Sequence, residues 1–338
     1  VLAALCFLMF VAYRGYSVIL FAPIAALGAV LLTDASLVAP MFTGLFMDKM
    51  VGFLKLYFPV FLLGAIFGKL IELSGFSKSI VRAVIRLFGP DRAMLSIVAV
   101  CAVLTYGGVS LFVVVFAVYP FAAELFRQSD IPKRLIPGTI ALGAFTFTMD
   151  ALPGTPQIQN IIPTSFFGTT TWAAPWLGTI GAAFILILGM SYLEWRRRAA
   201  KRGGEGYGDP ATLSNEPAAF AESKLAHPLL ALSPLLLVGI VNKLLTIWIP
   251  KTYGSSHEFV PAVIGNAAPV VQEVAKVAAI WSVQGALLVG IVSVVVLAWK
   301  PVTASFAEGA RTAIGGAMLA AMNTASEYGF GAVIAALP

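Results

Sequence analysis

The feature that most constrains this chain is a series of long apolar runs that contain no charged residue. One extends from Leu95 to Tyr119 and another from Pro228 to Val241. Charged residues make up 11% of the chain, whereas a soluble domain usually carries about 25%. Because about 20 apolar helical residues cross the hydrocarbon core of a bilayer, such runs predict membrane-spanning helices. We therefore expect an all-α polytopic membrane protein that is surrounded by the lipid bilayer.

Clusters of basic residues separate the apolar runs and set the expected topology. Loops rich in Lys and Arg face the cytoplasm by the positive-inside rule, so the net charge of +6 does not indicate a nucleic-acid partner. The third cluster opens a stretch with Gly, Pro and Ser, which is typical of a flexible linker. The expected spans are 1–13, 16–33, 51–74, 172–193, 228–250, 277–299 and 312–336. The expected domains are an N-terminal transmembrane half (1–193), a cytoplasmic linker (194–227) and the start of a C-terminal transmembrane half (228–338).

The apolar run 94–119 lies between basic loops at 77–92 and 124–134. It cannot cross the membrane once, because both loops are expected on the same side. It contains the sequence TYGGVS near its centre. We therefore predict a re-entrant hairpin over 94–120, with Gly107 and Gly108 turning its tip. The next segment, 135–165, must cross outward. Pro153 and Pro156 remove backbone donors there and predict a discontinuous helix.

A weak internal echo indicates inverted repeats. Glu72 precedes a Gly-Phe pair by a few residues, and Glu327 precedes another in the same way. By the count of crossings, the first element runs inward and the second outward, as expected for two halves of opposite orientation. The chain would then hold one complete repeat and only the beginning of a second, which would continue beyond Pro338.

Interrupted helices in transporters expose half-helix ends and unpaired backbone groups that can hold an anion. Polar side chains deep in a membrane are costly unless they have a partner. We therefore predict that the hairpin tip and the interrupted segment bind substrate. The alternatives are a structural turn for the tip and a position at the outer interface for the interrupted segment. The predicted binding residues are Thr105, Tyr106, Gly107, Gly108, Ser110, Pro153, Gly154, Thr155, Gln157 and Asn160.

Two acidic residues are candidates for carrying a proton. Asp150 lies beside the proline-rich break, and Glu327 lies in a polar run with Asn323, Thr324 and Ser326, which we also assign to the binding site. An ionisable group in a membrane segment is a functional candidate by default. An ion pair or an interfacial position is the alternative for each acid.

Motifs for other classes of chemistry are missing from the sequence. It has no Walker motif, zinc-ligand spacing or nucleophile elbow. We therefore expect no enzyme activity, no cofactor, no metal site and no ATP-driven transport.

The stretches TMDALPGTPQIQNIIPTSFFGTT (148–170) and NTASEYGFGAVIAALP (323–338) resemble the gluconate permease (GntP) family of the ion transporter superfamily. The resemblance implies proton-coupled uptake of gluconate or a related sugar acid or hydroxycarboxylate across a bacterial inner membrane by a multi-pass protein. It also implies inverted repeats, each with a re-entrant hairpin and a discontinuous helix. When the family's elements are carried over to this chain, the hairpin tip is Thr105–Ser110 and the unwound segment is Pro153–Asn160. The corresponding element of the second repeat is Asn323–Glu327.

The chain departs from the family pattern in two ways. Gluconate permeases have a break of the PPHPGP type where this chain reads ALPGTPQIQN, so the substrate could be a hydroxybutyrate- or citrate-like acid. Members of the family are also longer and contain a second hairpin. We predict a secondary active transporter, a symporter of a small organic anion and a proton. Sodium coupling and passive anion transport are the alternatives, and a homodimer is left open.

Overall fold

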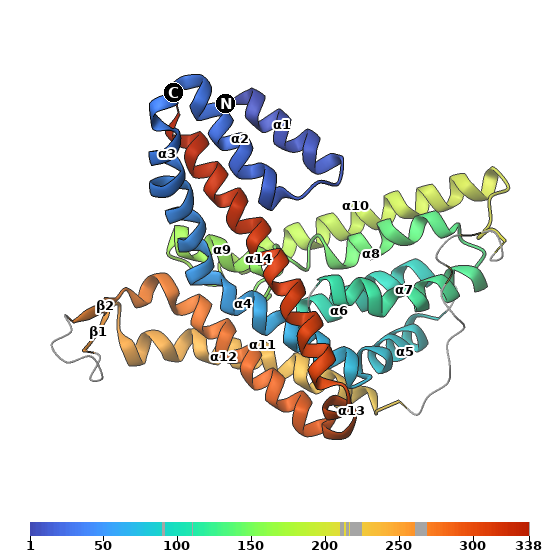
Figure 1. Ribbon diagram of the computed structural model, residues 1–338. Coiled ribbons are helices and arrows are strands. Elements are labelled where there is room, and N and C mark those ends of the chain that lie inside the picture. The colour runs from blue at the N-terminus through green and yellow to red at the C-terminus, as the bar shows by residue number, and fades with distance from the viewer. Residues whose placement is uncertain are drawn as a thin grey trace. The chain divides into compact units, whose positions relative to one another are not determined.

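The computed structural model of the protein describes residues 1–89, 92–109, 111–209, 213, 216, 225–260 and 269–337 (Figure 1). Within these ranges the regular elements are helices, apart from one short antiparallel ribbon. In the ribbon, β1 (His257–Phe259) pairs with β2 (Val270–Gln272), and Phe259 lies opposite Val270. This ribbon was not expected from the sequence.

Four helical segments among the described residues are long and apolar enough to cross a membrane, so the predicted all-α polytopic membrane protein is confirmed. The spans are Ala35–Leu73, Pro175–Arg202, Pro228–Tyr253 and Val274–Leu297. The helices are α1 (Leu2–Tyr13), α2 (Val18–Thr33), α3 (Val38–Pro40), α4 (Met47–Leu73), α5 (Phe76–Phe88), α6 (Ala93–Tyr106), α7 (Leu111–Gln128), α8 (Ile136–Ala144), α9 (Ile158–Phe167), α10 (Pro175–Arg202), α11 (Pro228–Tyr253), α12 (Val274–Leu297), α13 (Trp299–Ala304) and α14 (Phe306–Ala336).

Several helices differ in length from the expected spans. The third span begins near residue 35 rather than 51, because a 3₁₀ turn, α3 and a π-helical segment over Met41–Phe46 lead directly into α4. At the N-terminus, α1 and α2 have only 12 and 16 residues. Helix α14 has 31 residues but is not among the four spans, since the polar run NTASEY interrupts its apolar sequence.

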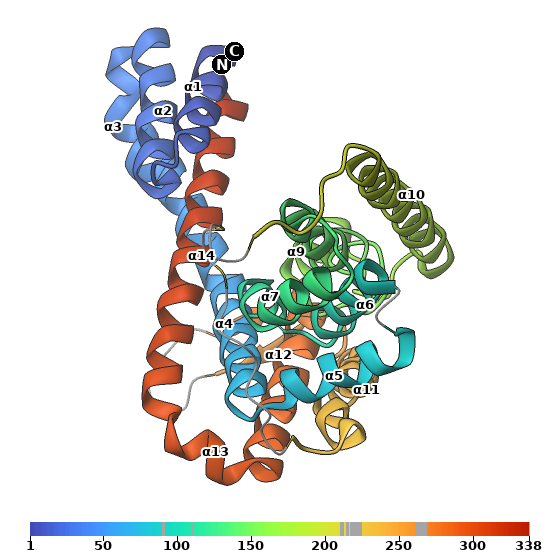
Figure 2. The ribbon, with the colours of Figure 1, turned by 90° about the vertical axis from the view of Figure 1, so that its right-hand side faces the viewer.

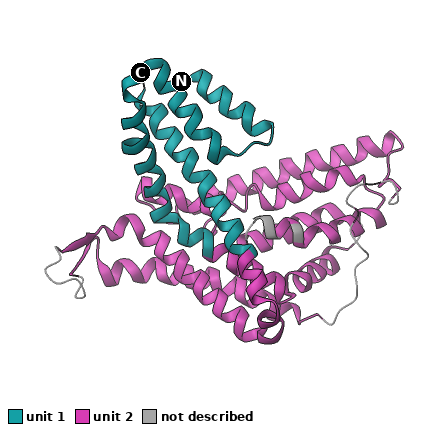
Figure 3. Ribbon diagram, in the orientation of Figure 1, with its two compact units in different colours: residues 1–62, 312–338 teal, residues 63–311 magenta. Residues whose placement is uncertain are grey.

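The described chain forms two compact units, which Figure 3 distinguishes by colour. Unit 1 comprises residues 1–62 and 312–338, and unit 2 comprises residues 63–311. The expected division into an N-terminal half (1–193), a linker (194–227) and the start of a C-terminal half (228–338) stays a prediction. The division into inverted repeats stays a prediction.

Unit 1 is held together by small residues that let its helices approach closely. Helices α1 and α2 pack together, and Ala22 and Ala26 of α2 are fully buried. A Cβ atom on Gly329 would lie 2.9 Å from the backbone oxygen of Phe46, so α14 needs glycine at this close-packed contact. The rings of Phe53 and Tyr328 lie 5.6 Å apart, which adds an aromatic contact.

Unit 2 is built around the short apolar helix α6, which packs against α5 and α7 (Figure 2) and against α8 (Figure 1). Most side chains of α6 are buried, among them Ile97 and Leu104. A Cβ atom on Gly143 of α8 would lie 2.6 Å from the backbone oxygen of Val98, so glycine permits the close contact of α8 with α6. Because α6 is enclosed by protein, its apolar side chains are part of a packed core.

The other part of unit 2 is the pair α11 and α12, which lie side by side with the β-ribbon between them in sequence (Figure 1). Helix α12 also contacts α9. A Cβ atom on Gly290 of α12 would lie 2.5 Å from a methyl carbon of Val238 on α11. This close packing positions α11 and α12 beside the interrupted segment of the chain.

Candidate functional site

The hairpin tip is the turn between α6 and α7. Helix α6 ends at Tyr106, and Gly108 adopts φ +92°, which a residue with a side chain rarely adopts. A Cβ atom on Gly107 would lie 2.4 Å from Leu235 of α11, and one on Gly108 would lie 3.1 Å from Pro156. The tip is therefore packed tightly against α11 and the interrupted segment. Ser110 lies outside the described residues.

The backbone N–H groups of the tip are used within the turn. Those of Gly107, Gly108 and Val109 each donate over 3.0 Å, to the carbonyl oxygens of Val103, Thr105 and Leu104. These three groups are not free to bind an anion. Side-chain groups must take that role if the tip contacts a substrate.

The interrupted segment is the non-helical stretch 145–157 between α8 and α9. Two prolines exclude a continuous helix here, because proline lacks the N–H group and clashes with the preceding turn. Gly154 adopts φ +83°, and its N–H donates to the backbone oxygen of Thr171 over 2.7 Å. The unwound part ends before Asn160, which lies in the first turn of α9.

Three side-chain hydrogen bonds join the tip to the interrupted segment. Tyr106 Oη donates to the backbone oxygen of Pro153 over 2.9 Å. Gln157 Nε2 donates to the backbone oxygens of Thr105, at 2.7 Å, and Val109, at 3.2 Å. The structure thus brings together two segments about 50 residues apart, and we call their contact the junction.

Asn160 stabilises the other side of the interrupted segment. Its Nδ2 atom donates to the backbone oxygens of Thr155 and Thr171, both over 3.0 Å. Gln157 and Asn160 therefore use their amide protons on the backbone. Their geometry gives both residues a positioning role, which the sequence alone did not indicate.

Residues that the sequence analysis did not single out complete the junction. Asn242 of α11 is fully buried, and its Nδ2 atom donates to the backbone oxygen of Gly154 over 3.2 Å and lies 3.5 Å from Thr171 Oγ1. The ring of Trp172 lies so close that a Cβ atom on Gly154 would be 2.4 Å from it. Lys243 Nζ lies 4.7 Å from the centre of that ring, a cation–π distance. The sequence signal that could have identified this part of α11 is an Asn-Lys pair inside an apolar span.

Four buried polar atoms at the junction have no hydrogen-bond partner among the described residues. They are Thr105 Oγ1, Thr155 Oγ1, Trp172 Nε1 and Asn242 Oδ1. Buried polar groups in native proteins are nearly always paired, so each exception requires an explanation. This set offers two hydroxyls, one N–H donor and one acceptor oxygen. Such a mixture suits a small ligand that carries both acceptors and a donor.

The two candidate acids lie in different units. Asp150 is exposed at the start of the interrupted segment in unit 2, and Glu327 is exposed on α14 in unit 1. Neither makes an ion pair among the described residues.

The polar residues around Glu327 lie on a continuous part of α14. Asn323 and Thr324 are half-buried, while Ser326 is buried. Thr324 Oγ1 donates to the backbone oxygen of Ala320 over 3.1 Å, and Ser326 Oγ donates to that of Met322 over 2.8 Å. These hydroxyls are satisfied by their own helix, in contrast to those of the junction.

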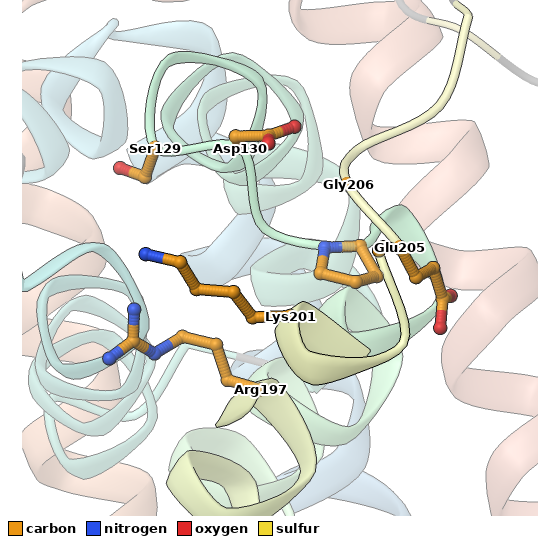
Figure 4. A pocket seen from close by; sticks show the side chains of 8 residues that line it. Ser129, Asp130, Arg197, Lys201, Glu205 and Gly206 are labelled. Atoms are coloured by element: carbon orange, nitrogen blue, oxygen red, sulfur yellow. The ribbon is translucent and has the colours of Figure 1, made fainter. Parts of the chain in front are cut away.

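A charged hollow lies where the end of α10 meets the turn between α7 and α8 (Figure 4). It has a volume of about 180 Å³. Its lining residues are Ser129, Asp130, Pro132, Arg197, Lys201, Gly204, Glu205 and Gly206. In Figure 4 the side chains of Arg197 and Lys201 extend toward the same side of the hollow.

Ion pairs and hydrogen bonds around this hollow fix the start of the linker. Asp130 Oδ1 accepts from the N–H of Tyr207 over 2.9 Å. Arg134 binds Glu205 through two hydrogen bonds of 2.5 and 2.6 Å, and this contact lowers the pKa of Glu205. We call the set Asp130, Lys133, Arg134, Glu205, Tyr207 and Glu216 the linker cluster.

Glu216 is the third acid of the linker cluster. It accepts from Lys133 Nζ over 2.6 Å and from Tyr207 Oη over 2.8 Å. Burial acts to raise the pKa of Glu216, but these two hydrogen bonds outweigh burial and its pKa lies below the usual value. Burial and the contact with Glu216 both raise the pKa of Tyr207. The carboxylates of Glu205 and Glu216 are thus each paired with a cation of the cluster.

The fold and the junction together define a class: an all-α membrane protein in which a hairpin tip is hydrogen-bonded to an interrupted helix, with unpaired polar atoms buried in these segments and their neighbours. This arrangement is typical of membrane transporters. The chain is 58% identical over 344 aligned positions to the uncharacterized transporter YxjC of Bacillus subtilis (strain 168), covering all of this chain and 72% of that relative. The protein therefore belongs to the same transporter family. No protein-family model matches the chain.

Proposed function

We propose that the protein is a secondary active transporter that carries a small hydroxylated carboxylate, such as gluconate or a hydroxybutyrate, together with a proton. The observation that carries this proposal is the set of four unpaired buried atoms at the junction. Trp172 Nε1 and the two threonine hydroxyls can donate to a carboxylate, and Asn242 Oδ1 can accept from a hydroxyl. A hydroxy acid supplies both kinds of group.

The charge at the junction favours an anion over a cation. An indole N–H can only donate a hydrogen bond, so it cannot be a ligand of Na⁺. The ammonium group of Lys243, above the same indole ring, repels a cation and attracts a carboxylate. These two groups support organic-anion binding and argue against a sodium site at this position.

Two further features support a coupled carrier of the gluconate permease kind. Hairpins and discontinuous helices form the substrate sites of many secondary transporters, and the two quoted motifs resemble that family. Asp150 lies in the interrupted segment and is the proposed proton carrier, with Glu327 as the second candidate. The bacterial inner membrane is the proposed location.

Uptake into proteoliposomes tests the proposal. With an imposed pH gradient, acidic outside, and no sodium present, we expect labelled gluconate or 3-hydroxybutyrate to accumulate above its external concentration. Accumulation that requires a sodium gradient would favour the sodium-coupled alternative, and equilibration without accumulation would favour passive transport. No uptake of any sugar acid or hydroxy acid tested would contradict the proposed function.

A further inference from the structure

We infer that Asn242 determines the specificity of the site for a hydroxyl group on the transported acid. This inference rests on the proposed function and names the group that distinguishes hydroxylated from unhydroxylated carboxylates. It comes from a residue of α11, outside the hairpin and the discontinuous helix.

The position of Asn242 is costly unless the residue has a further partner. It is fully buried in the middle of an apolar helix of 26 residues. An amide removed from water without hydrogen bonds is unfavourable. Because the amide is only partly satisfied within the described chain, it can accept a hydrogen bond from a donor outside the chain.

The hydrogen bonds of Asn242 determine which of its atoms is available. The backbone oxygen of Gly154 can only accept, so the side chain must direct its NH₂ group toward that oxygen, at 3.2 Å. The second proton of the NH₂ group points toward Thr171 Oγ1, at 3.5 Å. This orientation leaves Oδ1 without a partner among the described residues.

An amide oxygen needs a donor, and an ionised carboxylate has none. A hydroxyl on the substrate provides one. The unpaired donor Trp172 Nε1 belongs to the residue that follows Thr171 and packs against Gly154, so a carboxylate acceptor and a hydroxyl donor are both matched around Gly154. The chemistry indicates an acid that carries a hydroxyl as well as a carboxylate.

The first experiment compares 3-hydroxybutyrate with butyrate in proteoliposomes that contain the unmodified protein. The two acids have the same carbon chain and differ by one hydroxyl. Leaving a buried acceptor unpaired is costly, so we expect a preference of about 10- to 100-fold for the hydroxylated acid in kcat/KM. Equal transport of both acids would overturn the inference and leave the proposed function intact. Transport of neither these acids nor gluconate would overturn both.

The second experiment assigns the preference to Asn242. Asn242→Leu removes the acceptor at similar volume together with the hydrogen bond to Gly154, and we expect the preference to fall to within about threefold because hydroxybutyrate transport falls more than butyrate transport. The matched control is Thr246→Val on the same helix, which removes only a 2.8 Å hydrogen bond to the backbone oxygen of Asn242. It should keep the wild-type preference.

The readout is the preference and not the overall rate. A variant that inserts less well transports both acids more slowly by the same factor, so its preference is unchanged. An Asn242→Leu protein that keeps the wild-type preference would overturn the inference. If this variant fails to insert, Asn242→Ser supplies a shorter oxygen at the same position, and we expect it to reduce the preference partially. Retention of the full preference in that variant would likewise overturn the inference.

Discussion

The junction and the linker cluster both fix segments that are far apart in the chain, but they differ in how completely their polar groups are satisfied. In the linker cluster, Glu205 and Glu216 each receive two hydrogen bonds from protein donors. At the junction, four buried atoms receive none. Since the contacts of a structural cluster are complete and those of a binding site are completed by the ligand, this difference supports the binding role that we propose for the junction.

The two regions also differ in their exposure to solvent. The side chains of Arg134 and Glu205 are 48% and 42% exposed, and ion pairs of this kind contribute little to stability. Asn242 and Thr155 are fully buried, where an unpaired polar group is costly. Substitutions at the junction should therefore have larger effects than substitutions in the linker cluster.

The largest effect is expected for Gly154→Ala. The backbone there has φ +83°, and the new Cβ atom would lie 2.4 Å from Trp172. Backbone strain and overpacking together should cost about 2–5 kcal/mol, and uptake should be lost. Gly168→Ala is the matched control, because Gly168 also has positive φ but nothing lies within 4 Å of its Cβ position. If both variants transport equally well, the junction does not depend on this packing.

The next effect is expected for Gln157→Ala. Loss of its amide leaves the backbone oxygens of Thr105 and Val109 without this donor and releases the hairpin tip from the interrupted segment. Initial uptake rates should fall about 10- to 100-fold. Gln159→Ala, at an exposed position two residues away, should remain near wild type. Similar rates for the two variants would contradict the role of Gln157.

Asp150→Asn tests coupling separately from binding. The variant cannot lose a proton at this position, so accumulation driven by a pH gradient should disappear, whereas exchange of labelled for unlabelled substrate should continue. The same two assays on Glu327→Gln identify which acid carries the proton. Undiminished accumulation in both variants would remove these acids from the mechanism.

The smallest effect is expected in the linker cluster. Because the pKa of Glu205 is lowered in the folded protein, its contact with Arg134 stabilises the linker above the ordinary pKa of a glutamate and weakens as pH falls through the lowered value. Cleavage of the linker by a protease should be constant between pH 8 and pH 5, and Glu205→Gln at pH 7 should change it by no more than about fivefold. If Glu205→Gln changed the rate of substrate uptake more than the rate of linker cleavage, the cluster would have a role in transport.

The breaks in the helices could be predicted from sequence because glycine and proline act locally. Gly107 and Gly108 end α6, and Pro153 and Pro156 lie in the interrupted segment, as their backbone chemistry requires. The cross-links could not be predicted in this way. Which backbone oxygens Gln157 binds depends on how two segments about 50 residues apart meet in space.

The contribution of α11 was missed for a related reason. An apolar span was assigned from its average composition, and one asparagine changes that average little. The position of Asn242 becomes informative only when Gly154 is known to lie beside it. The inverted repeats and the role of Asn323–Glu327 depend on the same kind of spatial information, and they stay predictions.

The most direct test of the central claim is a structure of the protein with a transported hydroxy acid bound. We predict that the carboxylate lies about 3 Å from Trp172 Nε1 and that the hydroxyl donates to Asn242 Oδ1 at a similar distance. An acid bound at another position, with the four junction atoms still unpaired or paired only with water, would contradict the account.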